Sequence, residues 1–154
     1  MEVSVRSARL TDVDAAVRVL TPRPVDPETA RSDADRLRHL LFVPAATVIV
    51  ATAERRLVGV GVLSIRPSVR SGPFVGVIDD LGVDAVGTLS ADEAADAALR
   101  DEVASRMLAQ LIASARNKGC SRVEVTDPLA SAEPALMEQA GFERQGSLLS
   151  RAIG

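Results

Sequence analysis

The spacing of apolar residues in the first 41 positions changes from one period to another. Residues 3–8 begin with apolar positions two apart, which is typical of a strand with one buried face. Residues 11–20 instead carry apolar side chains at helical spacing. After a proline-rich interruption, Asp26 followed by Pro27 is typical of a helix N-cap with proline in the first turn. The pattern therefore predicts a strand, a helix, and a second helix that runs toward Leu41.

Two valine-rich runs follow, at residues 47–53 and 57–65. Their β-branched residues favour strands, and the short segment 54–56 between them suits an antiparallel hairpin. This turn contains no glycine, so the sequence leaves its type open. A polar connection with prolines and a glycine then leads to a further predicted strand, residues 74–83.

The following segment contains neither glycine nor proline from Ser90 until Gly119. Ser90 with Glu93 forms a capping-box pattern, which predicts that a long helix starts at Ser90. Its apolar residues share one helical face, and Arg116 and Lys118 suit the negative end of the helix dipole. We therefore expect this helix to lie on the sheet.

The last part of the chain predicts one strand over residues 122–126 and a helix over residues 131–140. From Phe142 the pattern is extended again, and Gly146 indicates a turn or bulge between two short strands. The predicted order is β-α-α-β-β-β-α-β-α-β, with antiparallel hairpins early and βα units late. The fold class is therefore α/β, with a mixed (α+β) sheet.

Composition narrows the class of protein. The length of 154 residues, with 47% apolar and 25% charged residues, indicates one globular domain over residues 1–154. Eighteen basic against 21 acidic residues give a net charge of −3, which does not favour nucleic acid as a partner. Because the chain has one cysteine (Cys120) and one histidine (His39), we expect no internal disulfide and no bound metal. No apolar run reaches the ~20 residues of a membrane span, and no export signal opens the chain, so we expect a cytoplasmic protein without a membrane partner.

Three segments carry a resemblance to a known family. Residues 78–84 read Ile-Asp-Asp-Leu-Gly-Val-Asp, residues 100–106 read Arg-Asp-Glu-Val-Ala-Ser-Arg, and residues 135–142 end in Gly-Phe. In their order and spacing these segments resemble the GNAT superfamily of N-acyltransferases, and the similarity in element order extends over essentially the whole chain. The resemblance implies a GNAT-like acyl-CoA N-acyltransferase fold with acetyl-CoA as the cosubstrate.

The resemblance also implies which residues meet acetyl-CoA. In that family a strand backbone meets the pantetheine arm, and a glycine-rich loop before a helix binds the pyrophosphate on free N–H groups. The corresponding residues here are Leu81, Gly82, Val83, Arg100, Val103, Ala104, Ser105 and Arg106. If residues 100–106 are this loop, Val103→Gly is expected to increase CoA affinity, because valine adds bulk and restricts φ.

Two features depart from the family pattern around this loop. Val103 and Ser105 stand where the family has glycine or another small residue. Residues 86–98 are inserted relative to the family's short connection, and no helix breaker inside residues 90–98 marks where the helix begins. If the helix starts at Ser90, the N–H groups of residues 101–106 are already bonded to carbonyls one turn back.

Two groups of charged residues are candidates for chemistry. Asp79 and Asp80 could act as the general base for an incoming amine, or could face solvent or pair with arginine instead. Arg100 and Arg106 could bind CoA phosphates, or could be solvated helix charges.

Met137 stands where many family members have a tyrosine acid, and a thioether cannot donate a proton. The chain has no tyrosine, so the acid would be water, Cys120, Ser131 or a carboxyl group.

The leading hypothesis is an acyl-CoA-dependent N-acetyltransferase in which a small-molecule or peptide amine attacks the thioester directly. The alternative is a catalytically inactive GNAT-like binding or oligomerisation module, which the altered loop and the missing tyrosine favour. The resemblance makes a homodimer possible. A receiver-like signalling domain, suggested by Ile-Asp-Asp at residues 78–80, does not suit the antiparallel hairpins.

Overall fold

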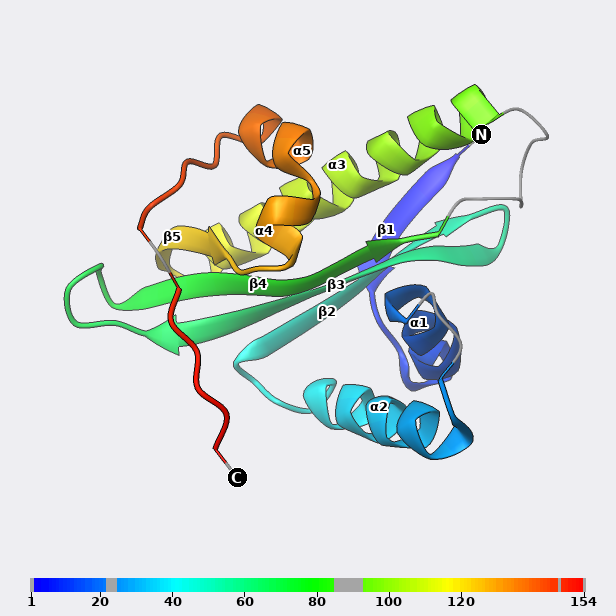
Figure 1. The fold of residues 1–154 in the computed structure, drawn as a ribbon, viewed down its shortest axis with the longest axis horizontal. Coiled ribbons are helices and arrows are strands. Elements are labelled where there is room, and N and C mark those ends of the chain that lie inside the picture. The colour runs from blue at the N-terminus through cyan, green and yellow to red at the C-terminus, as the bar shows by residue number, and fades with distance from the viewer. Residues whose placement is uncertain (1, 22–24, 85–92, 147, 154) are drawn as a thin grey trace.

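A five-stranded mixed sheet forms the centre of the structure, a computed structural model (Figure 1). The structure describes residues 2–21, 25–84, 93–146 and 148–153. The strands are β1 (Val3–Ser7), β2 (Ala46–Ala53), β3 (Arg56–Pro67), β4 (Phe74–Val83) and β5 (Cys120–Val125). The helices are a short 3₁₀ turn η1 (Leu10–Asp12), α1 (Val13–Leu20), α2 (Pro27–Leu40), α3 (Glu93–Asn117), α4 (Leu129–Ala132) and α5 (Pro134–Gln139). Strands β1 to β4 are antiparallel neighbours in chain order, and β5 pairs with β4 in parallel.

The predictions for the N-terminal half are confirmed. Asp26 caps α2, because its side chain accepts a hydrogen bond from the amide of Thr29 at 2.9 Å. The β2–β3 hairpin forms with Glu54 and Arg55 at φ of 50° and 66°. These values show the type of turn, which the sequence left open. Left-handed conformations at both turn residues match the twist of the flanking strands even without glycine.

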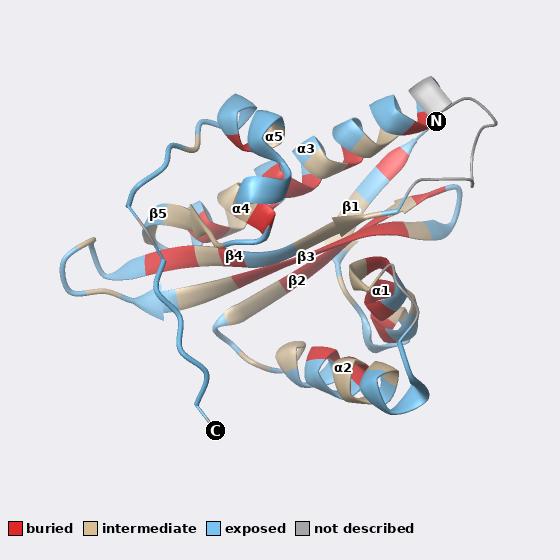
Figure 2. Cartoon of the chain, viewed as in Figure 1, coloured by how far each residue is buried: buried red, intermediate tan, exposed pale blue. Residues whose placement is uncertain are grey.

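Helices cover both faces of the sheet. One face packs against α1 and α2, and the other packs against α3, α4 and α5 (Figures 1 and 2). Val103, Met107 and Leu111 project from α3 into the core and are fully buried. Gly59 of β3 lets α3 approach closely, since a Cβ there would lie 2.5 Å from the Met107 sulfur. Tight packing at this point fixes α3 against the sheet.

The long predicted helix is present as α3, which runs without interruption from Glu93 to Asn117. Gly119 follows with φ 85°, the left-handed conformation that commonly ends a helix. The predicted start at Ser90 lies outside the described residues, as does residue range 85–92 of the insertion.

In the last part of the chain, the predicted strand is confirmed as β5, but the helix bounds and the two final strands are wrong. The helix expected over residues 131–140 is two short helices, α4 and α5, separated at Glu133 with φ −129°. The two strands expected after Phe142 are absent, because the described residues from 142 onward form neither helix nor strand. Leu148 and Leu149 are 66% and 93% exposed, so their extended pattern has no sheet to pack against. Among the described residues the sheet ends at β5.

At 25 residues α3 is long enough to raise the question of a membrane span. Charged residues such as Arg100, Asp101 and Glu102 interrupt its sequence, and its apolar stripe packs on the sheet. Across the described part of the chain, no helix combines the length and the apolar character that crossing a membrane requires.

Candidate functional site

A β-bulge in β4 sets the position of the two candidate carboxylates. Opposite β3, Ile78 pairs with Leu63 and Asp80 pairs with Val62, so Asp79 is an extra residue in the register. A bulge bends its strand and redirects neighbouring side chains, and bulges are frequent beside functional sites. Asp79 and Asp80 therefore lie at a bend in the middle of the sheet rather than in a regular alternating strand.

The strands β4 and β5 stop pairing at this bend. Their last paired residues are Ile78 and Val125, and the amide of Thr126 then bonds to the Ile78 carbonyl at 3.3 Å. From Asp79 to Val83, the edge of β4 that faces away from β3 pairs with no strand that the structure describes. An unpaired strand edge offers backbone groups to an extended ligand.

A hydrogen bond holds Asp79 at the point where the strands part. The Thr126 hydroxyl donates to Asp79 Oδ1 at 2.6 Å. Thr126 comes directly after β5, so this bond joins the end of β5 to the bulge in β4. The sequence analysis missed Thr126, because no motif singles out a threonine that becomes a neighbour through the fold.

Asp80 has the properties of a candidate base. Partial burial of its carboxyl group, and secondly the charge of Asp79, raise the pKa of Asp80 above its ordinary value of 3.8. The residue as a whole is exposed, so a ligand can reach the carboxylate. A raised pKa with solvent access is what a proton acceptor requires.

The three residues after the bulge lie half-buried along the free edge of β4. Leu81 and Val83 pack toward the α3 side of the sheet. Gly82 faces α1, where a Cβ would lie 3.2 Å from the Val19 carbonyl oxygen. The structure thus brings the predicted pantetheine segment and the two carboxylates together on one strand.

Residues 100–106 lie elsewhere and in a different environment. All seven belong to α3, and the i−4 carbonyl partners of amides 101–106 are residues 97–102 of the same helix. Val103 is fully buried against the sheet, and Arg106 donates to the Val3 carbonyl and so ties α3 to β1. Ser105 is exposed, and Ala104 is partly exposed. The backbone of this segment does not present free N–H groups to a pyrophosphate.

The position that corresponds to the family's tyrosine is also part of the core. Met137 is 6% exposed and belongs to the apolar cluster on the α3 side of the sheet, together with Leu129. Cys120, one of the alternative acids, is half-buried, and burial raises the pKa of its thiol. Ser131 donates to Asp127 at 2.6 Å.

Comparison by sequence identifies the family. The family model for "Acetyltransferase (GNAT) family" matches residues 13–142. The chain therefore belongs to the GNAT acetyltransferase family, whose members use acyl-CoA. No curated protein matches the sequence.

Solved structures show the same fold over nearly the full length. A transcriptional regulator from Bacillus halodurans C-125 matches with TM-score 0.77 and 17% identity, over 99% of this chain and 100% of its own. The aminoglycoside N-acetyltransferase AAC(6')-Iy in complex with CoA matches with TM-score 0.74 and 16% identity, over 99% and 95%. Ribosomal-protein-alanine N-acetyltransferase from Brucella melitensis biovar Abortus 2308 matches with TM-score 0.71 and 19% identity, over 99% and 100%. At these identities the likeness shows the GNAT-like α/β fold.

Proposed function

We propose that this chain is an N-acetyltransferase that transfers the acetyl group of acetyl-CoA to a primary amine of a small molecule or peptide. The observation that carries the proposal is the pair Asp79 and Asp80 at a bulge, beside an edge of β4 without a partner strand. Family membership supports it, as do similar folds named for N-acetyltransferases. We also propose that residues 1–154 form a single domain, that the protein is cytoplasmic and that it forms a homodimer.

In this proposal the residues of this chain attract and deprotonate the acceptor amine. A primary amine arrives largely protonated at neutral pH, and the two carboxylates attract it. Asp80 accepts a proton from the ammonium group, directly or through a water molecule, which leaves the lone pair free to attack a thioester carbonyl. The acetyl–sulfur bond would then break, and CoA would leave as a thiolate that takes up a proton. Asp79 Oδ1 accepts a hydrogen bond from the Thr126 hydroxyl, which holds this carboxylate beside the proposed amine site. Residues 100–106 do not fit the pyrophosphate, so we assign them no step.

A second candidate is a catalytically inactive GNAT-like module that binds an amine ligand or another copy of the chain. The uninterrupted α3 favours it, because the backbone amides expected to bind a pyrophosphate are bonded within the helix. Met137 favours it too, because the residue at the position of the family's tyrosine is packed into the core on the α3 side.

Thermal unfolding with and without millimolar acetyl-CoA separates the two candidates. A ligand that binds only the folded state raises the unfolding temperature. For an enzyme we expect such a shift, and release of free thiol in the presence of a primary amine. No shift and no thiol release would identify the inactive module.

The role of Asp80 is tested with Asp80→Asn. We expect acetylation to fall by about a hundredfold, the usual effect of losing a general base. Asp101→Asn removes an exposed carboxylate from α3 and serves as the control. Equal acetylation rates in the two variants would show that Asp80 is not the general base.

A further inference from the structure

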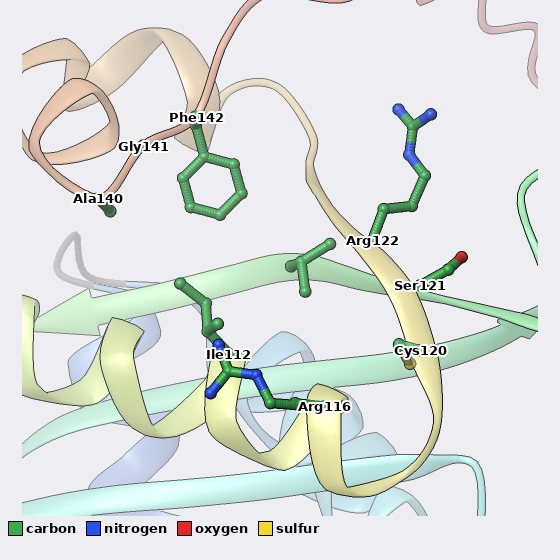
Figure 3. Close-up of a pocket in the computed structure, with 9 residues that line it drawn as sticks. Ile112, Arg116, Cys120, Ser121, Arg122, Ala140, Gly141 and Phe142 are labelled. Carbon is green, nitrogen blue, oxygen red and sulfur yellow. The ribbon is translucent and has the colours of Figure 1, made fainter.

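Two cavities meet along α3, on the side of the helix that faces α5. The larger, about 500 Å³, lies between α3 and α5 and is lined by residues that include Ser105, Leu108 and Leu136. The smaller, about 280 Å³, lies between the end of α3, β5 and the segment after α5 (Figure 3). Ile112, Arg116 and Ala140 line both cavities. We call the combined space the α3–α5 groove.

The charge of this groove differs from that of the chain as a whole. The chain has a net charge of −3, yet among the described residues the only ionised side chains that line the groove are those of Arg116 and Arg122. Arg122 lies 3.4 Å from Glu124 and points outward in Figure 3. In the view of Figure 3 the Arg116 side chain runs back along α3 in the direction of Ile112, and both residues line the two cavities. Within the described residues, no carboxylate forms an ion pair with Arg116.

The remaining wall of the larger cavity is mainly apolar and elongated. Leu108, Ile112 and Leu136 contribute aliphatic surface between the two helices. At a rise of about 1.5 Å per residue, Ser105 and Arg116 are about 16 Å apart along α3. A groove of this shape accepts a flexible apolar chain, and a cation at one end fixes the position of an anionic head group.

We propose that the α3–α5 groove binds a single-chain anionic amphiphile, such as a fatty acid or an alkyl phosphate. The head group bonds to the Arg116 guanidinium, and the chain lies along Leu108 and Leu136 toward Ser105. This site is independent of the proposed acetyl transfer. Arg116 is in the last turn of α3, and no residue of β4, where Asp79 and Asp80 lie, lines either cavity.

The experiment is calorimetric titration of the full chain with dodecanoate below its micelle concentration, and separately with dodecyl phosphate and with uncharged dodecanol. We expect both anions to bind at one site and dodecanol to bind at least about tenfold more weakly, because it lacks the charge-assisted hydrogen bonds. The ratio of the two anion affinities distinguishes a carboxylate from a phosphate ligand. Dodecanol binding as tightly as the anions would overturn the proposal.

Two substitutions locate the site. Arg116→Gln should weaken dodecanoate about tenfold or more while leaving dodecanol unchanged, whereas the control Lys118→Gln, on a neighbouring exposed cation outside the groove, should change neither. Ala109→Phe should weaken all three ligands, because Ala109 is exposed on α3 and a larger side chain there fills the larger cavity. Far-ultraviolet circular dichroism checks that each variant is folded. Equal affinities in Arg116→Gln and Lys118→Gln would refute a role for Arg116.

The chain's own C-terminal segment is the competing occupant. It follows Phe142, which lines the smaller cavity, and it exposes Leu148, Leu149 and Ile153. A variant with Leu148→Asp and Leu149→Asp should bind dodecanoate with unchanged affinity. A tenfold gain in affinity would mean that these leucines occupy the groove, and the amphiphile proposal would be wrong.

Discussion

The β4 bulge and residues 100–106 of α3 correspond to the two halves of one expected site, yet their backbones are in opposite situations. At the bulge the edge of β4 pairs with no described strand beyond Ile78, and Asp79 and Asp80 are exposed. In α3 the amides are bonded within the helix, and Val103 is fully buried. A ligand can approach the exposed carboxylates of the first region, whereas the backbone amides of the second are already bonded within α3. A match of side chains to the family motif therefore does not show that the backbone amides are free to bind a ligand.

The largest effect is expected for Val103→Gly, which tests whether Val103 belongs to the core or to a ligand site. If Val103 belongs to the core, the substitution leaves a cavity and places glycine inside a helix, and together these cost about 3 kcal/mol of unfolding free energy. Denaturant unfolding measures the loss. A titration with acetyl-CoA should show no gain in affinity, in contrast to what the motif alone predicts.

Ala104→Gly is the matched control for Val103→Gly. Ala104 is the next residue of the same helix but only partly buried, so its substitution should cost about 1 kcal/mol, mainly through helix propensity. Equal losses of unfolding free energy in the two variants, or a clear gain in CoA affinity in Val103→Gly alone, would contradict this interpretation. Residues 100–106 would then belong to the ligand site.

Sequence periodicity predicted the parts of the fold that depend on one-dimensional patterns. The face of α3 that carries Val103, Met107 and Leu111 was confirmed because burial follows helical spacing. The bulge was not predicted, because one extra residue in β4 is defined only by its register against β3. Thr126 was missed for the same reason, since it reaches Asp79 only after β5 pairs with β4.

The error at the C-terminus has a related cause. An extended pattern predicts a strand only if another strand edge receives it, and the sequence does not contain that information. Leu148, Leu149 and Ile153 have the apolar character of strand residues but remain exposed. Periodicity gave the overall element order, and the family resemblance could not show that an unbroken α3 would include residues 100–106.

A smaller effect is expected at the hydrogen bond that joins the end of β5 to the bulge in β4. Thr126→Val keeps the shape of the side chain and removes its bond to Asp79, which should cost about 1 kcal/mol of unfolding free energy. If the bulge is the amine site, the KM for the amine should rise while the variant remains folded. Ser131→Ala removes a comparable exposed bond to Asp127 and should leave the KM unchanged.

The smallest expected effect is the pH dependence of stability contributed by Asp80. Its pKa is raised in the folded protein, so folding favours the protonated carboxyl group. This contribution is complete below the ordinary pKa of 3.8 and is lost as the pH rises through the folded-state value. Asp80→Asn stays neutral, so at pH 7 it should be more stable than the wild type, by less than about 1 kcal/mol because the residue is exposed.

Unfolding of the wild type and of Asp80→Asn at a series of pH values between roughly 3 and 7 tests this sign, since that range spans the ordinary carboxyl pKa. The difference in unfolding free energy should grow in favour of the variant as the pH rises. Asp79→Asn should reduce the effect without abolishing it, because partial burial of Asp80 is the larger cause of its pKa shift and the charge of Asp79 the smaller. A difference with the opposite sign would mean that the Asp80 carboxylate is stabilised by the fold. The bulge would then be a less favourable place for a base than its geometry indicates.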